Sequence, residues 1–232
     1  MANDVPVADD AVRRNPEPLP IVSCGDPTLR RPARPVDLAH LRSGDLAQLI
    51  ARMRVTMEAA PGVGLAAPQI GEPLQLAVLA DNPERWGQLT EDELAARERS
   101  PVPFTVLINP QLSPVDGCGV VSFYEGCLSV PGLAGVVARH RSVRIDAFDA
   151  DGQPFSAVLS GWPARIAQHE IDHLRGILYL DRVETRSLST LDSYAQYWAG
   201  RPPAEAAAEL GFPLDGDRRL PPAELNLHVQ AH

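Results

Sequence analysis

The spacing of apolar residues separates helical from extended segments along the chain. Between residues 45 and 60, leucine, isoleucine and methionine return every three or four positions, and this period predicts an amphipathic helix. Apolar and polar residues alternate over 74–78, and a second, mostly apolar run over 105–108 ends at Asn109 and Pro110. Both segments are predicted to be strands, because alternation is the period of a β-strand and an Asn-Pro pair interrupts regular structure.

An acidic segment over residues 82–103 separates these two predicted strands. Within it, Thr90 and Glu93 have the spacing of a capping box, in which each side chain bonds the backbone N–H of the other residue. The box predicts a short helix over 91–98. We interpret the whole segment as a surface insertion.

The second half of the chain contains a predicted hairpin and then helices. Strand patterns over 143–148 and 155–159 flank an Asp-Gly pair, which is typical of a tight turn. Pro163 follows a Gly-Trp pair and opens a helix that runs to about Leu174, where Gly176 is placed to end it. Two further helical patterns cover 188–198 and 205–210.

This order of elements predicts an α+β fold. We expect antiparallel or mixed β-sheets packed around the helix that Pro163 opens. Residues 1–20 are predicted to be a flexible N-terminal arm, 21–200 the main domain, and 201–232 a C-terminal extension. The last twenty residues are rich in proline and are expected to be mobile.

Composition and charge restrict the possible functions. The 232 residues carry a net charge of −9, which argues against direct binding of nucleic acid. No apolar run approaches the ~20 residues of a membrane helix, so we expect no membrane contact. The first twenty residues lack the apolar core of a secretory signal. The chain is therefore expected in the cytoplasm, where Cys24, Cys118 and Cys127 would stay reduced.

His169, Glu170 and His173 form the strongest chemical motif of the sequence. On a helix, two histidines four positions apart stand one turn above each other and can reach the same metal ion. Glu170 is then placed to act as a general base on metal-bound water rather than as a ligand. The alternative is a coincidental pair of surface histidines. Ile166 and Ile171 argue against it, because they make one side of this helix apolar and predict its burial.

A catalytic metal site needs a third protein ligand and an open position for water. In metzincin-type proteases a third histidine follows a glycine; Gly176 is in place, but the ligand position holds Tyr179. In another protease arrangement a glutamate on a later helix binds the metal; Glu184 comes early for that, and Ser193 stands near the expected distance. Neither pattern is complete, which leaves a ligand upstream. Cys127 is the candidate, because a thiolate completes a three-ligand set.

Three short blocks, taken together, resemble the peptide deformylases. The first is GVGLAAPQ over residues 62–69, the second EGCLS over 125–129, and the third covers 168–176. All three stand in the order that the family has, and the match extends from about residue 29 to 182. The resemblance implies an enzyme that removes the N-formyl group from the first methionine of new polypeptides.

The resemblance also implies a role for each residue of the site. The implied metal ligands are Cys127, His169 and His173. The implied catalytic groups are Glu170 as acid and base, the Gln69 amide, and the backbone N–H of Leu128 in the same oxyanion site. The implied substrate-binding residues are Val63, Gly64 and Gly126, which would bind the peptide as an added strand, and Phe123, which would border the methionine pocket.

Cofactor and partners follow from the same resemblance. One divalent metal ion per chain is expected, Fe²⁺ in the cell, with Zn²⁺, Ni²⁺ or Co²⁺ able to substitute. N-formylmethionyl peptides are the expected substrates, in the form of nascent chains at the ribosome. The C-terminal tail is slightly acidic rather than basic, so its contact with a ribosome stays open.

Two other functions remain possible from the sequence alone. One is a different metallohydrolase, such as a peptidase that uses Asp181 or Glu184 as its third ligand. The other is a catalytically inactive member that serves as a binding protein. The loop expected over 131–135 also lacks the charged residues that some family members carry there, so its substrate contacts are not carried over.

Overall fold

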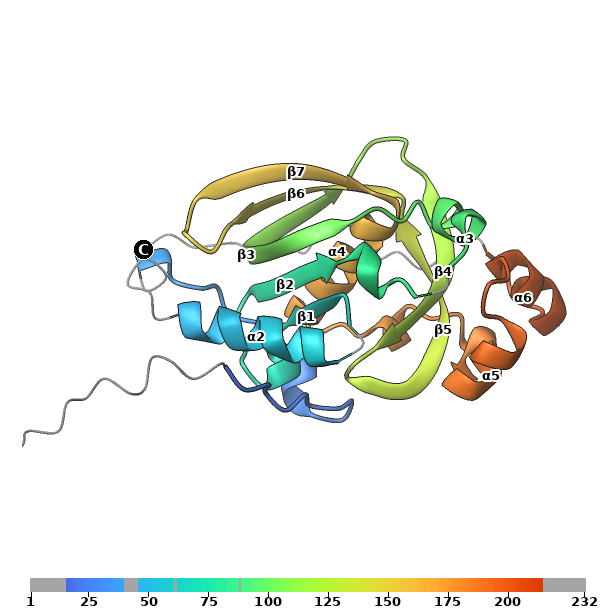
Figure 1. Cartoon of the computed structure of the whole chain (residues 1–232), viewed down its shortest axis with the longest axis horizontal. Helices are drawn as coiled ribbons and strands as arrows, with labels where there is room; N and C mark the ends of the chain where they lie inside the picture. The colour runs from blue at the N-terminus through green and yellow to red at the C-terminus, as the bar shows by residue number, and fades with distance from the viewer. Residues whose placement is uncertain (1–15, 40–45, 61, 88, 215–232) are drawn as a thin grey trace, which may run out of the picture.

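The computed structural model describes residues 16–39, 46–60, 62–87 and 89–214 (Figure 1). Residues 1–15 of the predicted arm and the predicted mobile tail from 215 onward lie outside these ranges. Among the described residues, no helix has the length and apolar character that crossing a bilayer requires.

Two antiparallel sheets form the framework of the protein. The larger sheet has the order β1-β2-β3-β6-β7 and the smaller one β4-β5-β8. The strands of the larger sheet are β1 (Gly64–Ala66), β2 (Leu76–Asp81), β3 (Val102–Pro114), β6 (Ser142–Phe148) and β7 (Pro154–Ser160). Those of the smaller sheet are β4 (Val120–Cys127), β5 (Val130–His140) and β8 (Ser189–Thr190). Every pair of these strands is antiparallel.

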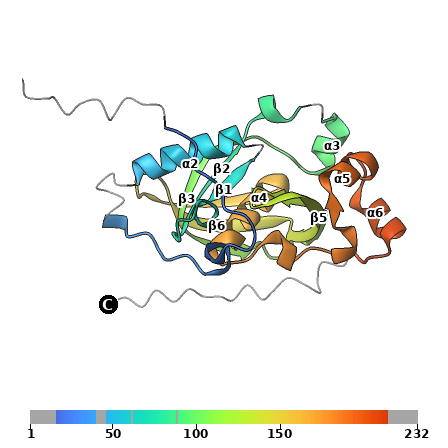
Figure 2. The same ribbon diagram turned by 90° about the horizontal axis from the view of Figure 1, so that it is seen from below.

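Helices cover both faces of the larger sheet and also pack against the smaller one. The α-helices are α2 (Ala47–Ala59), α3 (Glu91–Ala96), α4 (Gly161–Leu174), α5 (Leu191–Tyr197) and α6 (Pro203–Leu210). The short 3₁₀ helices are η1 (Pro27–Arg30), η2 (Ala67–Ile70), η3 (Pro83–Arg85), η4 (Tyr179–Asp181) and η5 (Thr185–Ser187). Figure 2 shows α2 and α4 on opposite sides of the strands.

Alternation along β2 explains this layering. Val78 belongs to the apolar cluster that includes Met53 and Met57 of α2, whereas Leu79 belongs to the cluster that includes Ile171 of α4. Successive strand residues face opposite sides of a sheet, so a strand buried on both faces is apolar throughout. The predicted α+β class with antiparallel sheets is thereby confirmed.

Several local predictions are also confirmed. Thr90 and Glu93 form the capping box at the start of α3. Strands β6 and β7 form the predicted hairpin, with Ser142 opposite Ser160. The predicted helix before Gly176 is α4, which begins two residues ahead of Pro163.

Strand β3 does not end at Asn109 and Pro110 as predicted. It continues to Pro114. Its pairing with β2 extends to Ile108, and its register against β6 shifts between Ile108 and Gln111. Asn109 has a φ of 50°, and its side chain bonds both backbone groups of Val36, accepting from N at 2.8 Å and donating to O at 2.9 Å. The pair therefore makes a bulge and does not end the strand, because asparagine tolerates the left-handed conformation and its side chain is hydrogen-bonded to Val36, which is distant in sequence.

The segment 131–135 is part of strand β5 and not a loop. Ala134 and Gly135 pair with β4 on one side, and Leu133 and Ala134 pair with β8 on the other. A Cβ on Gly135 would lie 2.4 Å from Val183 Cγ2. The glycine that suggested a loop is thus required by close packing within the sheet.

The helix predicted over 188–198 begins later, at Leu191, because Ser189–Thr190 forms β8. The Thr190 side chain then caps α5 by accepting from Ser193 N at 3.2 Å. Helix α6 agrees with the pattern over 205–210 and adds two residues before it.

Candidate active site

Three side chains with metal-binding atoms meet where the end of β4 approaches α4. The ligand atoms of Cys127, His169 and His173 lie within 4.8 Å of one another, and they form the one group of this kind in the part of the chain that the structure describes. Cys127 Sγ lies 3.3 Å from His173 Nε2. The rings of the two histidines are 5.0 Å apart between centroids. One ion can bridge such a set.

Helix α4 brings its two histidines onto one side by its register. Pro163 lies in the first turn, where its missing N–H leaves no intrahelical bond unmade. Gly176 follows the helix with a φ of 75°, and a Cβ there would lie 2.8 Å from the Arg30 carbonyl. The helix therefore ends directly after His173, at Leu174, and Gly176 packs against a segment distant in sequence.

Glu125 orients the ring of His169. Its Oε2 lies 3.0 Å from His169 Nδ1, so Nδ1–H can donate to it while Nε2 stays available to a metal. Burial alone would raise the pKa of Glu125, but the Arg139 guanidinium, together with His169, holds that pKa well below its usual range. Arg139 donates to both Glu125 oxygens at 2.9 Å, and Arg165 Nη1 donates to Oε1 at 2.6 Å. Glu125 is therefore a fixed carboxylate.

Gln69 presents an amide N–H₂ to Cys127. The side chain is 1% exposed, and its Oε1 accepts from the backbone N of Ala66 at 2.8 Å. That bond turns Nε2 toward the site, where it lies 3.6 Å from Cys127 Sγ and 3.3 Å from Ser129 Oγ. A neutral donor in this position can stabilise a developing negative charge without binding a carboxylate product tightly.

Glu170 is buried beside the same centre. Burial raises its pKa to about 7, a value near the pH at which a proton acceptor is most effective. Its Oε2 has no hydrogen-bond partner among the described residues. A Cβ on Gly64 would lie 2.3 Å from Glu170 Oε1, so only glycine fits next to this carboxyl group.

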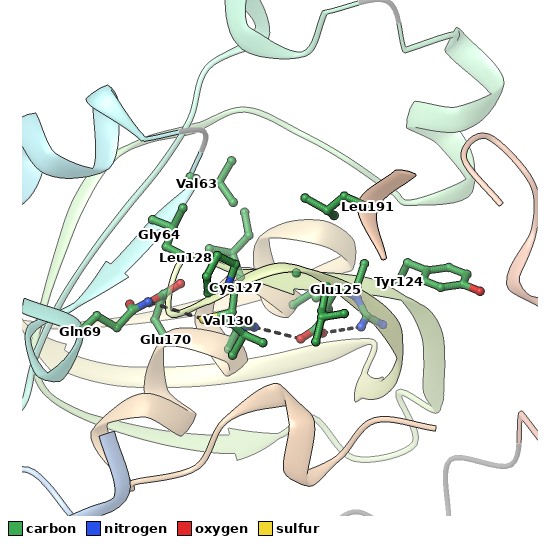
Figure 3. Close-up of a pocket in the computed structure, with 18 of the residues that line it drawn as sticks. Val63, Gly64, Gln69, Tyr124, Glu125, Cys127, Leu128, Val130, Glu170 and Leu191 are labelled. Carbon is green, nitrogen blue, oxygen red and sulfur yellow. Dashed lines mark hydrogen bonds and ion pairs between the residues drawn. The ribbon is translucent and has the colours of Figure 1, made fainter. Parts of the chain in front are cut away.

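A cavity of about 560 Å³ opens above these groups. Figure 3 shows Gln69, Cys127 and Glu170 low on one side, and Val63 facing Leu191 across the opening. The volume is in the range of sites that hold a ligand larger than one side chain. The cavity is lined by residues of both sheets, of α4 and of α5.

Comparison with known proteins relates this geometry to a family. The sequence pattern described as "Polypeptide deformylase" matches residues 18–188. The chain belongs to the peptide deformylase family. Peptide deformylase 1 of Streptomyces coelicolor is 49% identical over 199 residues, which cover 86% of this chain and 88% of the relative.

Solved structures of peptide deformylases resemble the fold as well. One from Acinetobacter baumannii, with Met-Ala-Ser bound, has a TM-score of 0.63 and 33% identity, covering 72% of this chain and 98% of that chain. Another from Synechococcus elongatus, in complex with actinonin, has a TM-score of 0.60 and 34% identity, covering 94% and 99%.

Most residues that the deformylase resemblance singled out lie at the cavity. Those in its wall are Val63, Gly64, Gln69, Gly126, Cys127, Leu128, His169 and Glu170. Phe123 is not in the wall. Its ring lies edge-on to Trp162, 6.4 Å between centroids, and the Arg165 guanidinium stacks 5.4 Å from it. Phe123 thus supports two residues that do line the cavity.

The alternative third ligands lie outside the metal-binding group. Neither Asp181 nor Glu184 belongs to it. Asp181 Oδ2 accepts from the backbone N of Leu178 at 2.8 Å and pairs with Arg30. Asp181 thereby closes the turn after α4.

Several wall residues were not identified as site residues from the sequence, among them four on α4 and α5. Trp162 and Arg165 precede His169 by seven and four positions on α4, and this helical spacing was a signal that could have identified them. Leu191 and Tyr194 reach the cavity from α5. No local pattern relates α5 to a deformylase site, because its position depends on tertiary packing.

The segment 82–103, predicted to be an insertion, contacts the Trp162 ring from outside the cavity through Arg99. The Arg99 guanidinium lies 5.5 Å from the Trp162 ring and 5.4 Å from the Trp86 ring. Two hydrogen bonds, of 2.8 and 2.9 Å, fix Arg99 on the buried carboxylate of Asp81. The insertion therefore contributes to the cavity through this arginine.

We expect Gly64→Ala to lower kcat by about 10², because the new methyl group must displace the Glu170 carboxyl and a misplacement of about 1 Å costs this much. Steady-state kinetics, with metal content and thermal unfolding as controls, measure the effect. In a Glu170→Gln background the same substitution should lower kcat far less, since the group it displaces is already inactive. Independent, multiplicative losses in the double variant would contradict this account.

Proposed function

We propose that the chain is a metal-dependent hydrolase that removes the formyl group from N-formylmethionyl peptides. Family membership supports this activity. The observation that carries the proposal is the close grouping of a thiol and two imidazoles beside a buried carboxyl group and a fixed amide donor. Metal-dependent hydrolysis of an amide uses three functions together: a bound metal, a proton acceptor and an oxyanion donor.

The residues present fit a divalent metal ion. Cys127, His169 and His173 offer one sulfur and two nitrogens, a set that binds Fe²⁺, Zn²⁺, Ni²⁺ and Co²⁺. The unpartnered Glu170 Oε2 fits a site that holds a further polar group when complete. An ion bound there would lower the pKa of a water molecule and so supply the nucleophile at neutral pH.

Glu170 moves the proton in the proposed mechanism. It accepts the proton of the water that attacks the formyl carbon, and it later passes that proton to the leaving nitrogen. Gln69 Nε2 and the backbone N–H of Leu128 donate to the formyl oxygen as negative charge develops on it. The C–N bond of the formyl amide then breaks, and the products are formate and a free amino terminus.

The peptide would bind between two free sheet edges. β1 is the edge strand of the larger sheet and β4 that of the smaller sheet, and Gly64 of β1 and Gly126 of β4 both border the cavity. An extended peptide can add a strand at such edges through main-chain hydrogen bonds. The first side chain would then enter the cavity toward Val63, Trp162 and Ile166, with Phe123 behind this wall.

A direct assay tests the proposed activity. Metal-loaded protein is incubated with formyl-Met-Ala-Ser or with acetyl-Met-Ala-Ser, and released formate or acetate and free amine are measured. We expect release from the formyl peptide only. The acetyl group carries a methyl group where the formyl group carries a hydrogen, and the buried Gln69 and Glu170 would have to move to make room for it. A peptidase would instead cleave the Met-Ala bond of both peptides, and an inactive binding protein would cleave neither.

Fe²⁺ is the proposed metal in the cell, and we place the enzyme in the cytoplasm, acting on chains that leave the ribosome. All three cysteines of the chain are free, as a reducing compartment requires. The set of one sulfur and two nitrogens suits each of these metals, so the identity of the metal needs a chemical test.

Iron-loaded protein is expected to lose activity steadily in air, while nickel-loaded protein persists. Dioxygen can oxidise Fe²⁺ and the Cys127 sulfur in an open site, and Ni²⁺ does not readily give up an electron. An activity time course of both forms, with mass spectrometry of the Cys127 peptide, measures this. Equal, slow decay with Cys127 unmodified would argue for Zn²⁺ instead.

A further inference from the structure

Helix α5 lies beyond the segment that the family pattern covers, yet it forms part of the cavity wall. The pattern ends at residue 188, and Leu191 and Tyr194 line the cavity together with Tyr124 and Ala134 of the smaller sheet. Three positions apart on α5, Leu191 and Tyr194 stand on the same side of the helix. Leu191 lies across the opening of the cavity from Val63 (Figure 3) and adds apolar surface to that side of the wall.

This surface is held in place by packing rather than by chain connectivity alone. The Tyr194 ring packs on Tyr124, with 4.9 Å between centroids. Trp198, directly after α5, is buried in a cluster with Val136 and Phe212. Strand β8 pairs with β5 immediately before the helix. The wall is therefore preorganised, which reduces the entropy lost when a ligand binds.

Leu191 is nevertheless 49% exposed. An exposed leucine on the wall of a cavity offers apolar area that an occupant of the cavity would remove from water. The cavity is also larger than one methionine side chain requires, at about 560 Å³. A side chain of the bound peptide other than that of the first residue is a suitable occupant of the remaining space.

We propose that Leu191 and Tyr194 form a subsite for the third residue of the formyl peptide and favour an apolar side chain there. The inference rests on the proposed function, because it takes the peptide to bind as an added strand along Gly64 and Gly126. In an extended chain, residues one and three point to the same side, about 6.5–7 Å apart, and residue two points away. With the first side chain in the cavity, the third meets the wall that α5 provides.

The test compares third residues in otherwise identical substrates. Metal-loaded protein is assayed with formyl-Met-Ala-Leu and formyl-Met-Ala-Ser, and binding of the products Met-Ala-Leu and Met-Ala-Ser is measured by calorimetry. We expect kcat/KM and affinity to favour leucine by about tenfold, the order of discrimination that burial of a small apolar group provides. Leu191→Ser should reduce this ratio to about two, and Leu191→Glu should shift the preference toward formyl-Met-Ala-Arg.

Leu188→Ser is the matched control. Leu188 is 41% exposed and lies outside the cavity wall, so this variant should keep the wild-type ratio. Equal kcat/KM for the leucine and serine peptides in wild-type protein, or an unchanged ratio in both Leu191 variants, would overturn the subsite. Absence of formate release from every formyl-Met peptide would overturn the proposed function itself, and these two failures are separate readouts of one assay.

Discussion

Cys127→Ser is expected to lose most of its bound divalent metal and, with it, nearly all activity. A neutral hydroxyl is a far poorer ligand than a thiolate, and only His169 and His173 would remain in the group. Elemental analysis of the purified variant, with circular dichroism to show that it is folded, measures the loss. The expected content is well below the one ion per chain expected of wild type.

Two other cysteines provide matched controls for this substitution. Cys24 is exposed and Cys118 is half-buried, and both are free and outside the metal-binding group. Cys24→Ser and Cys118→Ser should therefore keep the metal. If Cys127→Ser kept both metal and activity, the third ligand would be wrongly assigned, and Asp181 and Glu184 would be the next residues to replace.

Glu170→Gln is expected to keep the metal and to lower kcat by about 10²–10⁴, the usual loss when a positioned acid and base is removed. Glutamine keeps the size of the side chain but cannot accept the proton of the attacking water. Its position between the two histidines on α4, without membership of the ligand group, motivates the prediction. Metal content and single-turnover kinetics on formyl-Met-Ala-Ser measure the two effects separately.

An exposed glutamate serves as the control for Glu170→Gln. Glu58 pairs with Arg54 one turn before it on α2 and lies outside the cavity wall, so Glu58→Gln should change neither kcat nor metal content. Complete metal loss in folded Glu170→Gln would show that Glu170 is a ligand or a structural residue. An unchanged kcat would show that another group accepts the proton.

The parts of the site that the sequence predicted are those with a local period or a short motif. His169, Glu170 and His173 share one helix, and a spacing of four residues on a helix determines that the two rings lie on one side. Gln69 and Cys127 came from short blocks with a family resemblance. Their contact, at 3.6 Å between Nε2 and Sγ, depends on how the two sheets meet.

The groups that support the site could not be predicted in the same way. Glu125 orients His169, and Arg139 fixes Glu125 from β5, but these residues are separated by 14 to 44 positions in the chain. A buried arginine has no sequence pattern that distinguishes it from an exposed one. The same holds for Leu191, whose role in the cavity follows from the packing of Trp198 on β5.

Glycine has two structural roles in this chain that the sequence alone did not distinguish. Gly176 ends α4 in a left-handed conformation, as predicted. Gly135 lies inside β5, in a segment predicted to be a loop, because Val183 leaves no room for a Cβ. A glycine that permits a turn and one that permits close packing look identical until the fold is known.

The metal content of anaerobically purified protein, measured together with formate release from formyl-Met-Ala-Ser, tests the central claim most directly. The account predicts about one divalent ion per chain, loss of both ion and activity on chelation, and recovery of both when Fe²⁺ or Ni²⁺ is returned. Full deformylation by metal-free protein, or one tightly bound ion without any deformylation, would contradict it.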